Sequence, residues 1–142
     1  MKLNLHNAMW PGIVGKGHGA EEEEISLHRM IELTANTNVD GQTFDGIDLI
    51  LAAPHLNIHS TQHEIEKFAD TVLSHHLKIG SVVAPVWPAA GGGSAIGSVD
   101  ERKKFTDAVR NACEYCKVLN RHGVRSYGII RIDSADSPTS WV

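Results

Sequence analysis

Short apolar runs alternate with amphipathic stretches along this chain, and the most apolar run lies within residues 78–87. Residues 79–86 are almost all apolar or small, and Val82 and Val83 among them are β-branched. A run of this length without polar alternation indicates a strand that is covered on both faces. Pro85 would break a helix interior and has no N–H for strand pairing, so we expect regular pairing to end near it.

Three other stretches also have the pattern of strands. Residues 2–6 alternate in polarity, with Leu3 and Leu5 on one face, whereas residues 46–53 and 126–133 are runs rich in apolar side chains. Alternation with a period of two indicates a half-buried strand, and a short apolar run indicates a buried one. The chain therefore contains four predicted strands.

Stretches with helical spacing separate these strands. Apolar side chains recur with a helical period through residues 25–34, 65–73 and 105–119. Residues 61–64 and 98–101 each match the capping-box pattern, in which a hydroxyl residue is followed three positions later by Glu. These boxes predict where the second and third helices begin.

The segments before and after the first predicted helix also have informative compositions. Residues 21–24 are all Glu, and carboxylates favour the positive end of a helix dipole, so we expect them at the first turn of that helix. Residues 7–20 form a long glycine-containing loop, a kind of segment that is often functional. Residues 36–41 are rich in Asn, Asp and Gly and predict a turn.

The order β-α-β-α-β-α-β predicts an α/β fold in which parallel (β/α) units build one sheet. An eight-unit TIM barrel needs about 250 residues. The 142 residues of this chain supply about half of one, so we expect residues 1–142 to be the N-terminal half of a (β/α)8 barrel. A doubly wound domain is the alternative, although residues 15–19, which are rich in glycine, follow the first strand too late for its phosphate-binding turn.

Composition excludes several classes of function. The net charge of −4, with 42% hydrophobic and 21% charged residues, describes a globular chain without the basic patch that nucleic acid binding requires. The sequence has no recognisable secretory leader and no long apolar span, so we expect a cytoplasmic protein without a membrane partner. Cys113 and Cys116 form a C-x-x-C within a helical pattern, which favours packed core thiols over a redox pair.

Candidate site residues lie where the predicted strands end, because parallel α/β folds place their active groups at the carboxyl ends of strands. We expect the following residues to bind substrate: His6, Trp10, His55, Trp87, Arg131 and Asp133. Aromatic rings beside a few polar groups suit a sugar, whose C–H faces stack while its hydroxyls form hydrogen bonds. Structural roles stay open: buried imidazoles, packing of indoles at a barrel rim, or mutual neutralisation of Arg131 and Asp133.

His55, His59 and His63 are spaced four residues apart, as three zinc ligands on one helical face would be. The capping box at residues 61–64 places the first two before the helix, which favours solvated side chains over a metal centre. We therefore predict no metal site on this chain alone.

Four short strings in and around the predicted strands carry a family resemblance. They are Leu-Asn-Leu-His at 3–6, Phe-Asp-Gly-Ile-Asp-Leu at 44–49, Gly-Ser-Val-Val-Ala-Pro-Val-Trp at 80–87 and Tyr-Gly-Ile-Ile-Arg-Ile-Asp at 127–133. Together they resemble the N-terminal half of the xylose-isomerase-like barrel superfamily. That group includes sugar-phosphate isomerases and epimerases, ketose 3-epimerases and a family of abasic-site endonucleases.

The resemblance implies a complete eight-stranded barrel with a divalent metal such as Mn²⁺, Mg²⁺, Co²⁺ or Zn²⁺. Its isomerases move a proton at the carbon beside a carbonyl, while the metal polarises substrate oxygens. The metal carboxylates of the superfamily come from the later half of the barrel, so no catalytic residue is assigned here. The resemblance implies that four residues line the substrate pocket: His6, Trp10, His55 and Trp87.

The leading hypothesis is the N-terminal part of a metal-dependent sugar or sugar phosphate isomerase or epimerase. Its partners would be the sugar and a second barrel half, supplied by further sequence or by another copy of the chain. One alternative is a non-catalytic half-barrel that self-associates as a binding or structural module. The other is an abasic-site endonuclease, against which the acidic balance counts.

Overall fold

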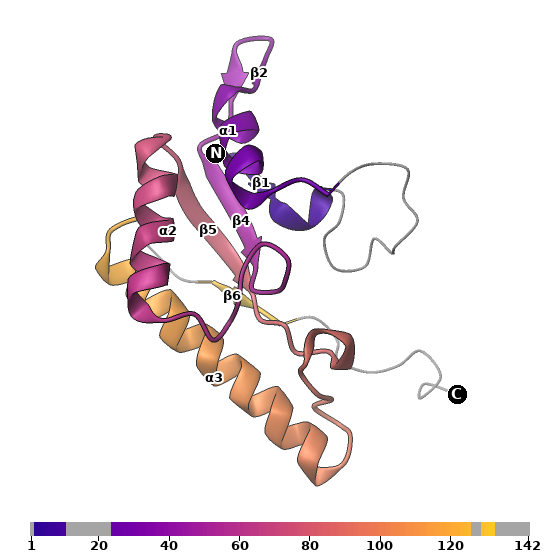
Figure 1. Cartoon of the computed structure of the whole chain (residues 1–142). Helices are drawn as coiled ribbons and strands as arrows, with labels where there is room; N and C mark the ends of the chain where they lie inside the picture. Colours follow the sequence, from indigo (N-terminus) through magenta and orange to yellow (C-terminus); the bar gives the residue numbers. More distant parts are fainter. Residues whose placement is uncertain (1, 11–23, 126–128, 133–142) are drawn as a thin grey trace.

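The computed structural model describes residues 2–10, 24–125 and 129–132 of the chain (Figure 1). These residues form a four-stranded parallel sheet, a two-stranded hairpin, three α-helices and two short 3-10 helices. The elements in chain order are β1 (Asn4–His6), η1 (Asn7–Met9), α1 (Leu27–Asn36), β2 (Asn38–Val39), β3 (Gln42–Thr43), β4 (Gly46–Ile50), α2 (Gln62–Ser74), β5 (Lys78–Val83), η2 (Pro88–Ala90), α3 (Val99–Arg121) and β6 (Ile130–Arg131). The predicted α/β class with a parallel sheet is confirmed.

The large sheet has the strand order β1-β4-β5-β6, and each neighbouring pair is parallel. The order of the strands across the sheet is therefore the same as their order along the chain. The register is regular except for an irregularity on β5, opposite residues 47–49 of β4. β1 and β6 form the two edges of the sheet as described.

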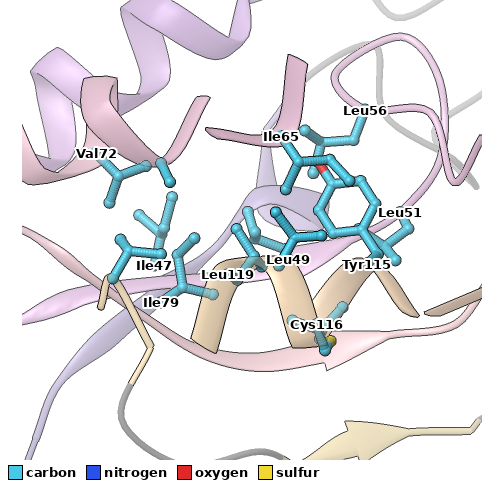
Figure 2. Close-up of a cluster of buried hydrophobic side chains, with 14 of the residues drawn as sticks. Ile47, Leu49, Leu51, Leu56, Ile65, Val72, Ile79, Tyr115, Cys116 and Leu119 are labelled. Atoms are coloured by element: carbon cyan, nitrogen blue, oxygen red, sulfur yellow. The ribbon is translucent and has the colours of Figure 1, made fainter. Parts of the chain in front are cut away.

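All three helices pack on one face of this sheet. Ile47 and Leu49 of β4 point to that face together with Ile79 and Val82 of β5, and they share one buried cluster with side chains from α1, α2 and α3. Figure 2 shows this cluster, in which Val72 of α2 and Leu119 of α3 lie over the strand residues. A doubly wound domain would need helices on both faces, which the described residues do not provide.

The strands are shorter than predicted. β4 ends at Ile50 rather than at residue 53, and the side chain of Asn7 takes up both backbone hydrogen-bonding groups of Ile50. β5 ends at Val83, two residues before Pro85, as expected from the missing proline N–H. β6 covers two residues, and part of the predicted strand at 126–133 lies outside the described residues.

Both predicted capping boxes are confirmed. The Thr61 hydroxyl accepts the N–H of Glu64, whose carboxylate accepts the N–H of Thr61, and Ser98 and Glu101 form the same reciprocal pair at α3. Each box satisfies two backbone donors that a helix start would otherwise leave unpaired. Gly123 follows α3 with a positive φ of 81°, a left-handed conformation that glycine adopts readily just after a helix ends.

The start of α1 differs from the prediction. α1 begins at Leu27, and the Ser26 hydroxyl caps it by accepting the N–H of Arg29. Glu24 lies before this cap, so the expectation that the acidic run forms the first helical turn is wrong for Glu24. Residues 21–23 lie outside the described residues. The start of α1 is therefore set by the Ser26 hydroxyl cap and not by carboxylates at the positive end of the helix dipole.

Candidate functional site

A row of polar side chains crosses the face of the sheet that the helices leave uncovered. Asp48 of β4 lies at its centre, where one carboxylate oxygen accepts hydrogen bonds from the Asn4 side-chain amide (2.9 Å) and the Ser81 backbone N–H (2.8 Å). Gly80 leaves room for these contacts, since a Cβ there would overlap both the Asn4 amide and the Asp48 carboxylate. We call Asn4, Asp48 and Ser81 the polar row.

His6 lies at the end of β1, directly beside the polar row. It is the register partner of Asp48 on β4, so both side chains leave the same face of the sheet. Its Nδ1 accepts the backbone N–H of Ala8 at 3.0 Å, and in the neutral ring the proton is therefore on Nε2. His6 is half-buried.

Asn7 follows His6 and joins the uncovered face to the end of β4. It is fully buried, and its side-chain amide accepts the Ile50 N–H (2.8 Å) and donates to the Ile50 carbonyl (3.3 Å). The side chain thereby extends the pairing of β1 with β4 where the backbone of β1 turns away into η1. An Asn after a strand is typical of an ordinary turn, so nothing in the sequence indicated this structural tie to β4.

Trp10 and Trp87 lie on the same small apolar cluster at the carboxyl end of the sheet. Both indoles pack against Ile50, Ala52 and Val83, which form the apolar part of the uncovered face. The Trp10 Nε1–H is buried without a hydrogen-bond partner among the described residues. The structure therefore places the two predicted aromatic residues together at one end of the polar face.

Arg131 pairs in register with Val83 and is exposed on the same face of the sheet. Asp133 lies outside the described residues, so its predicted proximity to Arg131 is untested. Four of the six predicted residues, His6, Trp10, Trp87 and Arg131, thus belong to the uncovered face or its carboxyl end.

His55 lies elsewhere. The loop after β4 carries it toward α1, where its Nε2–H donates to the Ile25 carbonyl at 2.6 Å, and the ring is only 9% exposed. Its Nδ1 is buried and has no partner among the described residues. The expectation that His55 joins the other strand-end residues in one mouth is therefore wrong, because the fold uses it to tie this loop to the start of α1.

His55 lines a cleft of about 860 Å³ between residues 51–60 and α3. The lining of this cleft includes none of His6, Trp10, Trp87 or Arg131. Its floor is apolar, with Phe68 and Tyr115 as its aromatic members, and α3 adds polar side chains to its rim. A volume of this size lies within the range of small-molecule sites.

No metal centre forms within the described part of the chain. Those residues contain no group of three or more His, Cys, Asp or Glu side chains placed to hold an ion. His59 and His63 are exposed, while His55 is buried against Ile25, so the three histidines do not converge. The described residues therefore do not fit the divalent metal that the family resemblance implies, and we derive no step through it.

The two cysteines lie on α3 as free thiols, with Cys116 buried and Cys113 partly exposed. Burial raises the pKa of the Cys116 thiol above its ordinary value, and the nearby Cys113 adds to this effect. The pKa of this thiol is higher in the folded protein than in the unfolded chain, where it is about 8.5. The protonated thiol therefore contributes its full stabilisation of the fold below about pH 8.5, and this contribution is lost as the pH rises through the pKa of the folded state.

We expect iodoacetamide near pH 8 to alkylate Cys113 well before Cys116 in the folded protein. Cys116 is covered by the core and holds little reactive thiolate at that pH. Peptide mass spectrometry over a time course measures both rates, with urea-unfolded protein as the control in which both react. Equal rates in the folded protein would contradict the packed-thiol interpretation of the C-x-x-C.

Comparison with known proteins adds no assignment to this geometry. No family model, curated protein or solved structure matches the chain. Across the described ranges, no helix combines the length and apolar character that crossing a membrane requires.

Proposed function

We propose that this chain is the N-terminal, substrate-binding half of a (β/α)8 barrel enzyme that isomerises or epimerises a sugar or sugar phosphate in the cytoplasm. The observation that carries the proposal is the one-sided sheet. Its strands follow one another in chain order, its three helices cover one face, and its other face bears polar side chains that end at two tryptophans. In a (β/α)8 barrel, too, parallel strands follow one another in chain order and the helices cover one face of the sheet.

The chemistry of the uncovered face suits a polyhydroxylated ligand. Asp48 uses one carboxylate oxygen within the polar row, and its second oxygen is available to accept a sugar hydroxyl. His6 lies directly beside the polar row, on the same face of the sheet, where its ring can contact the sugar. Trp10 and Trp87 supply flat apolar surfaces for the C–H face of the ring.

Arg131 supports a phosphorylated substrate. Its guanidinium is exposed on the same face as the polar row, and arginine matches the geometry of phosphate oxygens. In this proposal the divalent metal and the carboxylates that move the proton beside the carbonyl come from the other half of the barrel. The residues described here bind and orient the sugar.

The test uses the full-length protein in D2O with a panel of aldoses, ketoses and their phosphates, in the presence of Mn²⁺, Mg²⁺, Co²⁺ or Zn²⁺. We expect deuterium to enter the carbon beside the carbonyl, as followed by NMR. Trp87→Ala and His6→Ala should each reduce kcat/KM at least about tenfold, because each removes a contact that orients the sugar.

His76→Asn is the matched control. His76 is exposed just before β5, at the end of the sheet opposite the carboxyl ends of the strands. Its backbone has a φ of 59°, which Asn tolerates. Circular dichroism checks that each variant is folded. A panel without deuterium incorporation, or variants with wild-type kinetics, would refute the proposal.

Self-association of two half-barrels is the second candidate, and a specific observation favours it. β6 is an edge strand, and Ile129 and Ile132, which flank it, are both exposed. Apolar edge strands invite pairing with another chain. Light scattering that shows a dimer without isomerase activity would favour this module over the enzyme. An abasic-site endonuclease is the weakest candidate, because the net charge is −4.

A further inference from the structure

The cleft beside α3 carries unused hydrogen-bond donors at regular helical spacing. Lys104, Asn111 and Tyr115 all line it, at positions separated by seven and four residues, so they lie along one face of α3. None of these three side chains forms a hydrogen bond or ion pair with another described residue. Figure 1 shows the N-terminal part of α3 extending past α2.

Tyr115 is the innermost of the three donors. Its side chain is only 3% exposed, and Figure 2 shows its ring reaching from α3 past Ile65 toward Leu56 in the loop that forms the opposite wall. Burial raises the pKa of Tyr115, so its hydroxyl stays a neutral donor at physiological pH. The Tyr115 hydroxyl is not among the buried unpaired atoms of the described residues, so it is open to the cleft and can donate to a ligand there.

The carboxylates of the cleft already have partners. Asp107 pairs with Lys103 at 3.0 Å and Arg110 at 2.7 Å, and Glu64 accepts the Thr61 N–H and hydroxyl within its capping box. Hydrogen bonds from Lys103 and from the Thr61 backbone, respectively, lower the pKa values of Asp107 and Glu64. The unpaired groups are therefore a cation and neutral donors, which favours an anionic ligand.

The apolar residues that line the cleft indicate what kind of group the ligand has besides its negative charge. Phe68, Leu56 and the proline residues Pro54 and Pro85 give the cleft an apolar surface suited to a ring. Asn111 lies seven residues after Lys104, which corresponds to about 10 Å along the helix axis. An aromatic ring with a short acidic arm spans this distance when the Lys104 side chain extends toward the acidic group.

We propose that this cleft is a binding site for a small aromatic carboxylic acid, separate from the uncovered face of the sheet. The ring packs on Phe68 and the apolar wall, the carboxylate pairs with Lys104, and a polar substituent at the other end of the ring meets Asn111 and Tyr115. This inference does not depend on the proposed sugar chemistry, because the polar and aromatic side chains that carry the two sites are different.

The test compares two ligands that differ in charge. 4-Hydroxyphenylacetate carries the proposed carboxylate, whereas tyramine has the same phenol and an ammonium group. We expect isothermal titration of the full chain to show binding of the acid, weakened by added salt, and much weaker binding of tyramine. NMR shifts should concentrate at residues 54–60 and 104–115.

Two substitutions locate the contacts. Lys104→Gln should weaken the acid about fivefold, as expected for a solvent-exposed ion pair, and Tyr115→Phe should weaken it by a similar factor while keeping the ring that packs in the core. Lys117→Gln is the matched control on the same helix, since Lys117 pairs with Glu114 and does not line the cleft.

The outcomes separate cleanly. Preference for the acid, together with weakening by Lys104→Gln but not by Lys117→Gln, supports the proposal. Absence of binding at millimolar acid, equal affinity for tyramine, or equal effects of the two lysine variants overturns it. Trp87→Ala should leave this binding unchanged, so failure of the sugar assay and failure of this site are distinguishable.

Discussion

Replacing Leu49 with Ala is expected to lower the free energy of unfolding by about 3 kcal/mol. Leu49 is 0% exposed in the centre of β4, where it lies in the cluster that joins the sheet to all three helices. The substitution removes buried methyl groups and leaves a cavity that rigid strands on both sides cannot close. Urea unfolding followed by circular dichroism measures the loss.

Val39→Ala is the matched control for Leu49→Ala. Val39 is 63% exposed in the β2–β3 hairpin, so its truncation should change the free energy of unfolding by less than about 0.5 kcal/mol. If both variants lost similar stability, the helices would not be held to the sheet through the β4 side chains, and the one-sided core would be wrong.

Arg125→Met is expected to cost about 3 kcal/mol and to release β6 from the sheet. Arg125 is 2% exposed, and its guanidinium donates to the Gly80 carbonyl of β5 at 3.0 Å and to the Ile129 carbonyl beside β6 at 2.7 Å. Methionine fills similar space but leaves both carbonyls without this donor. Arg125→Lys should recover only part of the loss, because one ammonium cannot reproduce the fork of the guanidinium.

Hydrogen exchange separates this role from a general loss of stability. Arg125→Met should reduce protection in β5 and β6 more than in α2, whereas Arg121→Met, at an exposed position on α3, should leave both regions as in the wild type. Uniform loss of protection across the chain would show that Arg125 does not act as a local tie between β5 and β6.

Local signals in the sequence predicted much of the architecture. The capping boxes that begin with Thr61 and Ser98 need only a hydroxyl and a carboxylate three residues apart, so sequence spacing alone locates both helix starts. The end of β5 before Pro85 is local for the same reason, since proline lacks the N–H that pairing needs. The helical periods predicted which faces of α2 and α3 are buried.

The candidate site was only partly predictable. Counting residues to strand ends located Trp10 and Trp87, which share one apolar cluster. The same rule grouped His55 with them, but the path of the loop after β4 turns His55 toward Ile25 instead. The ties that Asn7 makes to Ile50 and that Arg125 makes to Gly80 gave no local signal, because these partners lie 43 and 45 residues away along the chain.

The sequence by itself determined the kinds and order of the elements, because hydrophobic period, capping and proline chemistry act over a few residues. The tertiary structure alone decided that all three described helices share one face of the sheet, that polar side chains line the other, and that α3 borders a cleft with unpaired donors. These features depend on contacts between distant segments, whose relative placement no local pattern encodes.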